Sequence, residues 1–250
     1  MASLRSRFWA STISKIIDNA PEINHPNDIR RDFSEDRISF LRANWKKKKY
    51  IDYTNINIDD LELLKLNNKK VKSNKTLLYL HGGGYVACGP ETHGALITQL
   101  SLITKSHVVF PIYRLAPENP FPAAIEDALL AYKYLLKEGI NSKEVFIAGD
   151  SAGGGLTLAL LQKIKSEELP TPSCAIVISP WTDLTLSGNS IHERGHRDPM
   201  IKPGPGMQVT VNAYCGDEDP MNPLISPLFA DYRDMPPIQI QVASEETIYD

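Results

Sequence analysis

The stretch that decides the fold is Val145-Phe-Ile-Ala-Gly-Asp-Ser-Ala-Gly-Gly-Gly-Leu156. A short apolar strand pattern, Val145–Ala148, runs into Gly-Asp-Ser-Ala-Gly, and an apolar helical pattern follows over 152–165. Strand, G-x-S-x-G and helix in this order are typical of a nucleophile elbow. Side chains at the two outer glycines would collide with neighbouring backbone, and the strained turn lifts the serine hydroxyl clear of the sheet. Ser151 is therefore the candidate nucleophile.

A second glycine motif, His81-Gly-Gly-Gly84, follows a predicted buried strand over 76–80. Backbone N–H groups held in such a loop stabilise the negative oxygen of an acyl-transfer intermediate by roughly 3 to 4 kcal/mol per donor. We predict that Gly83, Gly84 and Ala152 supply these N–H groups, although Gly82 is close enough to be confused with them. His81 is expected to anchor the loop through its ring nitrogens. Two independent motifs, each after a strand, together indicate acyl transfer at the serine.

The composition sets limits on the class of protein. At 250 residues and 42% apolar content, one domain with a single core is expected. The net charge of −3, from 27 basic and 30 acidic residues, argues against nucleic acid or an anionic membrane as the main partner. Three widely spaced cysteines favour a reducing compartment over a disulfide framework, so we expect a cytoplasmic protein. No apolar run approaches the roughly 18 residues that span a bilayer, so no stable membrane insertion is expected.

The remaining pattern predicts an α/β protein with a mostly parallel sheet and helices on both faces. The predicted strands are 53–58 and 61–66, an antiparallel pair, then 76–80, 108–113, 145–148, 175–179 and 238–243, with helices at 123–137 and 152–165. Residues 1–45, which are helical and polar, and the polar excursion 184–215 are expected to form a cap over a core of residues 46–250. Residues 1–17 fit an amphipathic helix better than a transit peptide.

The motifs together resemble the hormone-sensitive-lipase branch of the α/β-hydrolase esterases. The matching segments are HGGGY at 81–85, YRLAPE and PFPAA within 113–124, GDSAGG at 149–154, SPWTDL at 179–184, DPM at 198–200 and SPL at 226–228. The resemblance covers nearly everything from about residue 75 onward. It implies an α/β-hydrolase fold and a carboxylesterase that hydrolyses short- to medium-chain acyl esters through an acyl-enzyme on Ser151. It further implies a small-molecule ester as substrate and no metal or organic cofactor, and it leaves a homodimer open.

The resemblance also implies a catalytic acid in the loop after the predicted strand 238–243. We predict Glu246 for this role, with Glu245 as the alternative. The family's histidine comes after one more strand, but no histidine follows His196 in this sequence. We therefore expect a chain that is truncated before the triad histidine and lacks the last strand and helix of the sheet. The alternative is a catalytically inactive ligand-binding protein of the same fold.

Two other motifs suggest different chemistry and are weaker. His192-Glu-Arg-Gly-His196 matches HExxH, in which two histidines one helical turn apart bind zinc. Gly195, together with the nearby Gly188 and Pro199, argues against a helix at this position. Cys88 follows the glycine loop, but no elbow presents its thiol, and a packing role is expected.

Overall fold

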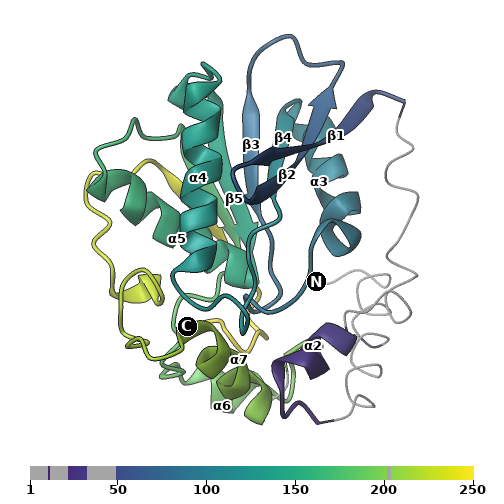
Figure 1. Ribbon diagram of the computed structural model, residues 1–250. Helices are drawn as coiled ribbons and strands as arrows, with labels where there is room; N and C mark the ends of the chain where they lie inside the picture. The colour runs from purple at the N-terminus through teal and green to yellow at the C-terminus, as the bar shows by residue number, and fades with distance from the viewer. Residues whose placement is uncertain (1–10, 12–21, 33–48, 202–203) are drawn as a thin grey trace.

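The computed structural model describes residues 11, 22–32, 49–201 and 204–250. Most of the segment 1–45, which we predicted as part of a cap, lies outside the described residues. Its described part contains helix α2 (Pro26–Asp32). The remaining described residues form a central sheet with helices packed on it (Figure 1).

The sheet has the predicted, mostly parallel arrangement. Its described strands are β1 (Ile51–Ile58), β2 (Leu61–Asn68), β3 (Thr76–Leu80), β4 (His107–Pro111), β5 (Val145–Asp150), β6 (Cys174–Ile178) and β7 (Ile238–Gln241). They lie in the order β1-β2-β4-β3-β5-β6-β7, and antiparallel pairing is confined to β1 with β2 and β2 with β4. The carboxyl ends of β3, β5, β6 and β7 therefore meet at one end of the sheet.

Helices cover both faces of the sheet, as predicted. Helices α4 (Ala123–Lys137) and α5 (Ser151–Ser166) pack against each other on one face, and α3 (Pro90–Thr104) covers the other. Strand β3 shows the alternation that this arrangement requires. Leu78 and Leu80 belong to the core cluster under α4 and α5, whereas Leu77 and Tyr79 belong to the cluster that contains Ile97 of α3. Both faces of the strand are buried, which explains its unbroken apolar sequence.

Helix α3 was not among the predicted elements. Its buried residues are Gly94, Ile97, Thr98 and Ser101, and Leu100 and Leu102 are partly buried against the same core cluster. The two hydroxyl groups are hydrogen-bonded within the fold: Thr98 donates to the carbonyl of Gly94 and Ser101 to that of Ser106, each at 2.7 Å. Leu96 and Ile103 of the same helix are exposed, so apolar residues are spread around α3 and its apolar period is weak.

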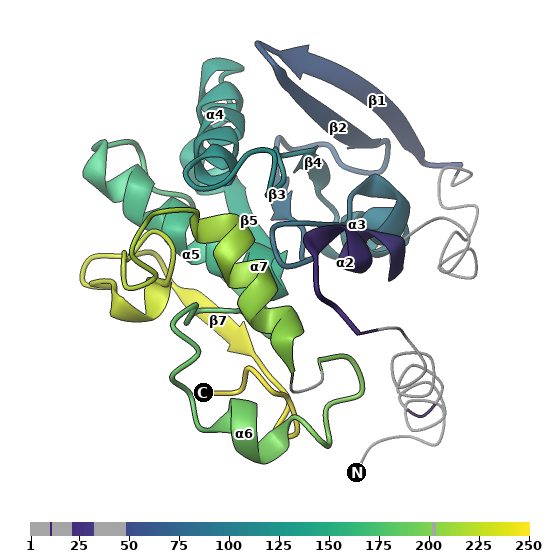
Figure 2. The same ribbon diagram turned by 60° about the horizontal axis from the view of Figure 1, so that its bottom comes forward.

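The excursion 184–215 contains two helices, α6 (Ser190–Arg194) and α7 (Pro205–Cys215). With α2, they lie at one end of the sheet (Figure 2). The argument against a helix around 192–196 was wrong in part, because α6 includes His192 and Glu193; it ends before Gly195. Two single 3₁₀ turns complete the described elements, η2 (Ser142–Glu144) and η3 (Pro227–Phe229).

The close contact between α5 and β3 generates a stability prediction at Gly153. A Cβ at this position would lie 2.1 Å from the carbonyl oxygen of Leu80 and 2.4 Å from that of His81, and backbone cannot move aside as a flexible side chain can. We expect Gly153→Ala to lower the free energy of unfolding by about 3 kcal/mol, measured by urea unfolding followed by circular dichroism.

The matched control is Gly89→Ala, where a Cβ would meet only the flexible end of Glu91 at 3.3 Å. Gly89 caps α3, so the control is expected to cost at most about 1 kcal/mol. Equal unfolding midpoints for the two variants would contradict the close packing of α5 on β3.

Candidate active site

Ser151 lies in the strained turn that the G-x-S-x-G pattern predicts. It is the first residue of α5 and follows the last residue of β5 directly, with a left-handed φ of 50°. A Cβ on Gly149 would lie 2.2 Å from the carbonyl oxygen of Gly153. The turn is thus possible only with glycine at position 149. Ser151 lies at the N-terminus of α5, which is the positive end of the helix dipole.

The glycine loop after β3 is a compact turn closed on Gly83. The Gly83 carbonyl accepts hydrogen bonds from the N–H groups of Val86 at 3.1 Å and Ala87 at 3.0 Å. Gly83 and Gly84 have φ values of 120° and 62°, which favour glycine. A Cβ on Gly83 would lie 2.2 Å from the carbonyl oxygen of Ala87. The loop therefore needs glycine at both predicted donor positions.

Gly82 is distinguished from its neighbours by what its N–H does. The Gly82 N–H donates to Oδ1 of Asp150 at 3.1 Å. Within the described part of the chain, the N–H groups of Gly83 and Gly84 donate to no protein acceptor. Ala152 lies in the first turn of α5, where N–H groups lack an intrahelical acceptor. The geometry thus leaves the three predicted N–H groups available, whereas that of Gly82 is occupied.

Asp150 connects the turn at Ser151 with the glycine loop. Its Oδ1 also accepts from the Tyr79 hydroxyl at 2.8 Å, and its Oδ2 lies 3.3 Å from Nε2 of His93 on α3. Burial by itself would raise the pKa of the Asp150 carboxyl, but the hydrogen bonds and charge of its partners outweigh it and hold the pKa below its ordinary value. Sequence reasoning passed over this residue, although it stands inside the motif that identified Ser151.

His81 is fully buried and contacts the loop through one ring nitrogen, whereas its Nε2 has no hydrogen-bond partner among the described residues. Its Nδ1 lies 2.7 Å from the Gly82 carbonyl oxygen, and its ring stacks on Tyr113 with centroids 4.2 Å apart. Burial, and next the neighbouring His93, lower the pKa of His81 to about 3. The ring is therefore neutral near pH 7, and Nδ1 carries the proton that the Gly82 carbonyl accepts.

The two candidate acids are in different environments. Glu245 is exposed and forms an ion pair with Arg197 at 3.3 Å. Glu246 points into the fold: its Oε1 accepts from the Ser179 hydroxyl at 2.7 Å and from the Ala243 N–H at 3.2 Å. Its Oε2 is buried and has no hydrogen-bond partner among the described residues. Glu246 thus carries a fixed carboxylate with one free acceptor, beyond the carboxyl ends of β6 and β7.

The two weaker motifs do not assemble a site. In the ranges that the structure describes, no group of three His, Cys, Asp or Glu side chains is arranged to hold a metal ion. His196 lies beyond the end of α6, and its Nε2 accepts from Arg197 at 3.2 Å. Burial raises the pKa of the Cys88 thiol to about 12, against the opposing effect of a hydrogen bond with Thr92. Near pH 7 the Cys88 thiol is therefore in its protonated form, which is a poor nucleophile.

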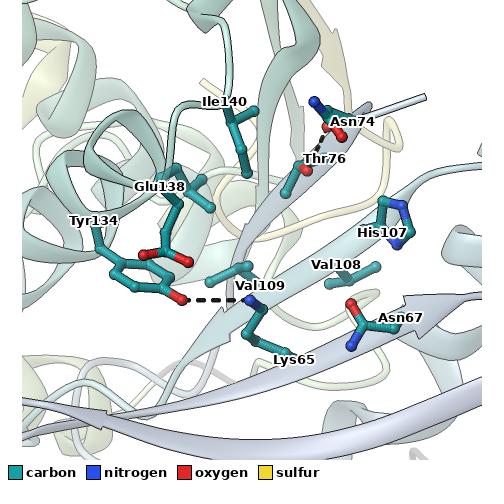
Figure 3. Close-up of a pocket in the computed structure, with 11 residues that line it drawn as sticks. Lys65, Asn67, Asn74, Thr76, His107, Val108, Val109, Tyr134, Glu138 and Ile140 are labelled. Atoms are coloured by element: carbon teal, nitrogen blue, oxygen red, sulfur yellow. Dashed lines mark hydrogen bonds between the residues drawn. The ribbon is translucent and has the colours of Figure 1, made fainter.

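A separate cavity of about 190 Å³ lies at the other end of the sheet (Figure 3). It opens beside Thr76 and His107, the first residues of β3 and β4, whereas Ser151 follows the last residue of β5. Lys65 Nζ and the Tyr134 hydroxyl, 3.3 Å apart, form one wall. Because these strands are parallel, this cavity and the serine are at opposite ends of the sheet and do not share a site.

Among the described helices, none combines the length and the apolar character that a membrane crossing requires.

Comparison with known proteins gives consistent matches. A family described as the alpha/beta hydrolase fold matches residues 77–250. An acetyl-hydrolase of Streptomyces hygroscopicus is 42% identical over 176 residues, which cover 70% of this chain and 58% of that protein. An esterase of Acinetobacter venetianus is 34% identical over 200 residues, which cover 78% of this chain and 66% of that protein. The chain thus spans less than two thirds of the length of these two relatives.

Solved structures match over almost the whole chain. An esterase from the bacterial hormone-sensitive lipase family superposes with a TM-score of 0.87 at 30% sequence identity, covering 99% of this chain and 81% of that one. A mutant of the esterase E40 superposes with a TM-score of 0.90 at 29% identity, with the same coverage of both chains. The similarity therefore includes both the sheet and the loops at its carboxyl end.

The environment of Asp150 generates a prediction on stability and pH. Its folded-state pKa lies below the ordinary 3.8, so its contribution to stability is present above that value and is lost as the pH falls through the folded-state pKa. We expect Asp150→Asn to lower the free energy of unfolding by about 1 to 3 kcal/mol at neutral pH, and by progressively less below about pH 4.

Urea unfolding of both proteins from about pH 7 to about pH 3 measures this difference. Asp60→Asn, in the exposed turn between β1 and β2, is the control and is expected to stay within about 0.5 kcal/mol of the unmodified protein. A destabilisation by Asp150→Asn that is the same at every pH would contradict a carboxylate role.

Proposed function

The chain belongs to the alpha/beta hydrolase fold family, and from this premise we propose that it is a serine carboxylesterase. The observation that carries the proposal is the left-handed turn at Ser151, which joins β5 to α5 beside a glycine loop with unused N–H groups. The names of three relatives support the reaction class: an acetyl-hydrolase, an esterase and a carboxylesterase/phospholipase match at 42%, 34% and 35% identity.

In the proposed reaction, Ser151 Oγ attacks the carbonyl carbon of the ester. The serine proton passes to a general base, which returns it to the leaving alkoxide, so an alcohol departs and the acyl group stays on Oγ. Water then attacks the acyl-enzyme with help from the same base, and the carboxylic acid leaves while the serine is restored. Proton transfer and covalent catalysis complete this sequence without a metal or organic cofactor.

The N–H groups of Gly83, Gly84 and Ala152 are proposed to stabilise the oxyanion of both tetrahedral intermediates. Each preorganised donor is worth roughly 3 to 4 kcal/mol in such a site. The loop bonds at Gly83 and the link from Gly82 to Asp150 support this assignment, because they hold the donors in place before substrate binds. No reorganisation is then needed as charge develops.

Glu246 is proposed as the acid that orients the general base. The hydrogen bonds to its Oε1 fix the carboxylate, and its buried Oε2 is available as an acceptor. A carboxylate in this role holds the base in the correct tautomer and stabilises it once protonated. The base itself is not assigned to any residue of the described ranges.

Short- to medium-chain acyl esters are the proposed substrates. Two relatives carry names that include acetyl-hydrolase, and a third is called an ethyl acetate hydrolase, which supports a small acyl group. We propose that the excursion 184–215 is part of a cap and limits the acyl length. Its helix α7 contacts the glycine loop directly, since a Cβ on Gly84 would lie 2.8 Å from Thr210 Cγ2.

Replacement of the nucleophile tests the proposal. In the protein that also carries the general base, we expect Ser151→Ala to reduce kcat for p-nitrophenyl butyrate by up to about 10⁶-fold, because no acyl-enzyme forms without Oγ. Cys88→Ser is the control, since its buried thiol takes no part in the reaction. Turnover that survives Ser151→Ala would refute the serine mechanism. Ester binding without any turnover in the unmodified protein would instead favour the ligand-binding alternative.

The two glutamates give a second test. In the protein that also carries the general base, we expect Glu246→Gln to reduce kcat by about 10³- to 10⁴-fold, because a neutral amide stabilises the protonated base poorly. Glu245→Gln, the matched change at the adjacent exposed residue, is expected to stay within about twofold of the unmodified protein. Initial rates on the same ester measure both. The opposite ranking would assign the acid to Glu245.

A further inference from the structure

Arg30 of α2 reaches out of its helix and binds two backbone carbonyls of the core. Its Nε donates to the Val86 carbonyl and its Nη2 to the Ala116 carbonyl, each at 2.7 Å. The same guanidinium forms a two-point ion pair with Glu118, with N–O distances of 2.7 and 2.5 Å. One side chain thus joins α2 to two loops that are 56 and 86 residues away in the sequence.

The two carbonyls belong to the backbone that shapes the glycine loop. The N–H of Val86 closes the turn on Gly83, and the N–H of Ala116 donates to the Tyr85 carbonyl at 3.0 Å. The side chains of Val86 and Ala116 are fully buried. The planar guanidinium therefore ties together the two backbone segments at Val86 and Ala116.

The loop has two anchors of opposite charge. The Asp150 carboxylate holds its beginning at Gly82, and the Arg30 guanidinium holds its end at Val86. Because glycine backbone has the widest conformational freedom, a segment with three successive glycines needs both ends fixed to keep its N–H groups aligned. We propose that Arg30 is a positioning residue for the glycine loop and its oxyanion-binding N–H groups. This proposal rests on the proposed esterase function.

A second contact supports the same connection. A Cβ on Gly206 of α7 would lie 3.2 Å from Ile23, which precedes α2, while Thr210 of the same helix lies against Gly84. The segment that carries Arg30 therefore packs on α7, and α7 packs on the loop. A displacement of α2 would therefore shift the N–H groups of Gly83 and Gly84 both through Arg30 and through α7.

The ion pair with Glu118 is not sufficient to explain this arrangement. The Glu118 side chain is 58% exposed, and exposed ion pairs contribute little. The carbonyl bonds are different, because loss of the donor leaves buried acceptors without a partner. Removal of the carboxylate and removal of the guanidinium should therefore have unequal effects on the loop.

The kinetic test compares Arg30→Ala with Glu118→Ala and with Arg233→Ala, which removes an exposed ion pair with Asp231. We expect Arg30→Ala to reduce kcat for p-nitrophenyl butyrate by about tenfold or more with KM within about twofold, because misaligned donors weaken binding of the transition state. The two other variants are expected to stay within about twofold in both constants. An unchanged kcat in Arg30→Ala, or equal losses in Arg30→Ala and Glu118→Ala, would overturn the proposal.

Amide hydrogen exchange gives a readout that does not depend on turnover. The N–H groups of Val86 and Ala87, both bonded to Gly83, are expected to exchange at least about tenfold faster in Arg30→Ala than in Glu118→Ala. If Arg30→Ala fails to fold, Arg30→Lys replaces it. The single ammonium group of lysine cannot donate to the Val86 and Ala116 carbonyls with the fixed geometry of a guanidinium. Unchanged exchange would overturn the positioning role. If the unmodified protein does not hydrolyse the ester but amide exchange is faster in Arg30→Ala, only the proposed esterase function is refuted.

Discussion

The N-terminus of α5 lies so close to the end of β3 that no side chain fits between them. A Cβ on Gly153 would approach the carbonyl oxygens of Leu80 and His81 within 2.4 Å, and one on Gly149 would meet Gly153 itself. This contact puts the first turn of α5, with its unpaired N–H groups, beside the residues where β3 becomes the glycine loop. Ser151 and the loop are therefore placed by one backbone approach, and the remaining interactions refine their positions.

Charge then fixes what the close approach brings together. The carboxylate of Asp150 accepts from Tyr79 of β3, from Gly82 of the glycine loop and from His93 of α3, so three elements are joined at one partly buried group. Arg30 performs the corresponding task at the other end of the loop. Hydrogen bonds to charged groups are stronger than those between neutral groups, which suits them to holding glycine backbone in one conformation. A preorganised loop of this kind is what stabilises developing negative charge.

Much of the fold could be predicted because its elements have strong local signals. The unbroken apolar run of β3 and the apolar period of α4 gave bounds that the structure reproduces. Helix α3 was missed because its apolar period is weak. Gly94, Thr98 and Ser101 are among its buried residues, whereas Leu96 and Ile103 are exposed. We predicted no helix at the position of α6 because of Gly188, Gly195 and Pro199. All three residues lie outside the five residues of this helix.

The sequence by itself determined the turn at Ser151 and the glycine loop, because steric exclusion at a strained φ leaves only glycine at the neighbouring positions and this restriction is visible in a few consecutive residues. Only the tertiary structure distinguished the surroundings of Glu245 and Glu246, since the difference is made by Ser179 on one side and Arg197 on the other. Only the tertiary structure brought Arg30 and Asp150 to the two ends of the loop. Such contacts join residues far apart in the chain, and they depend on how the layers pack rather than on any local preference of the backbone.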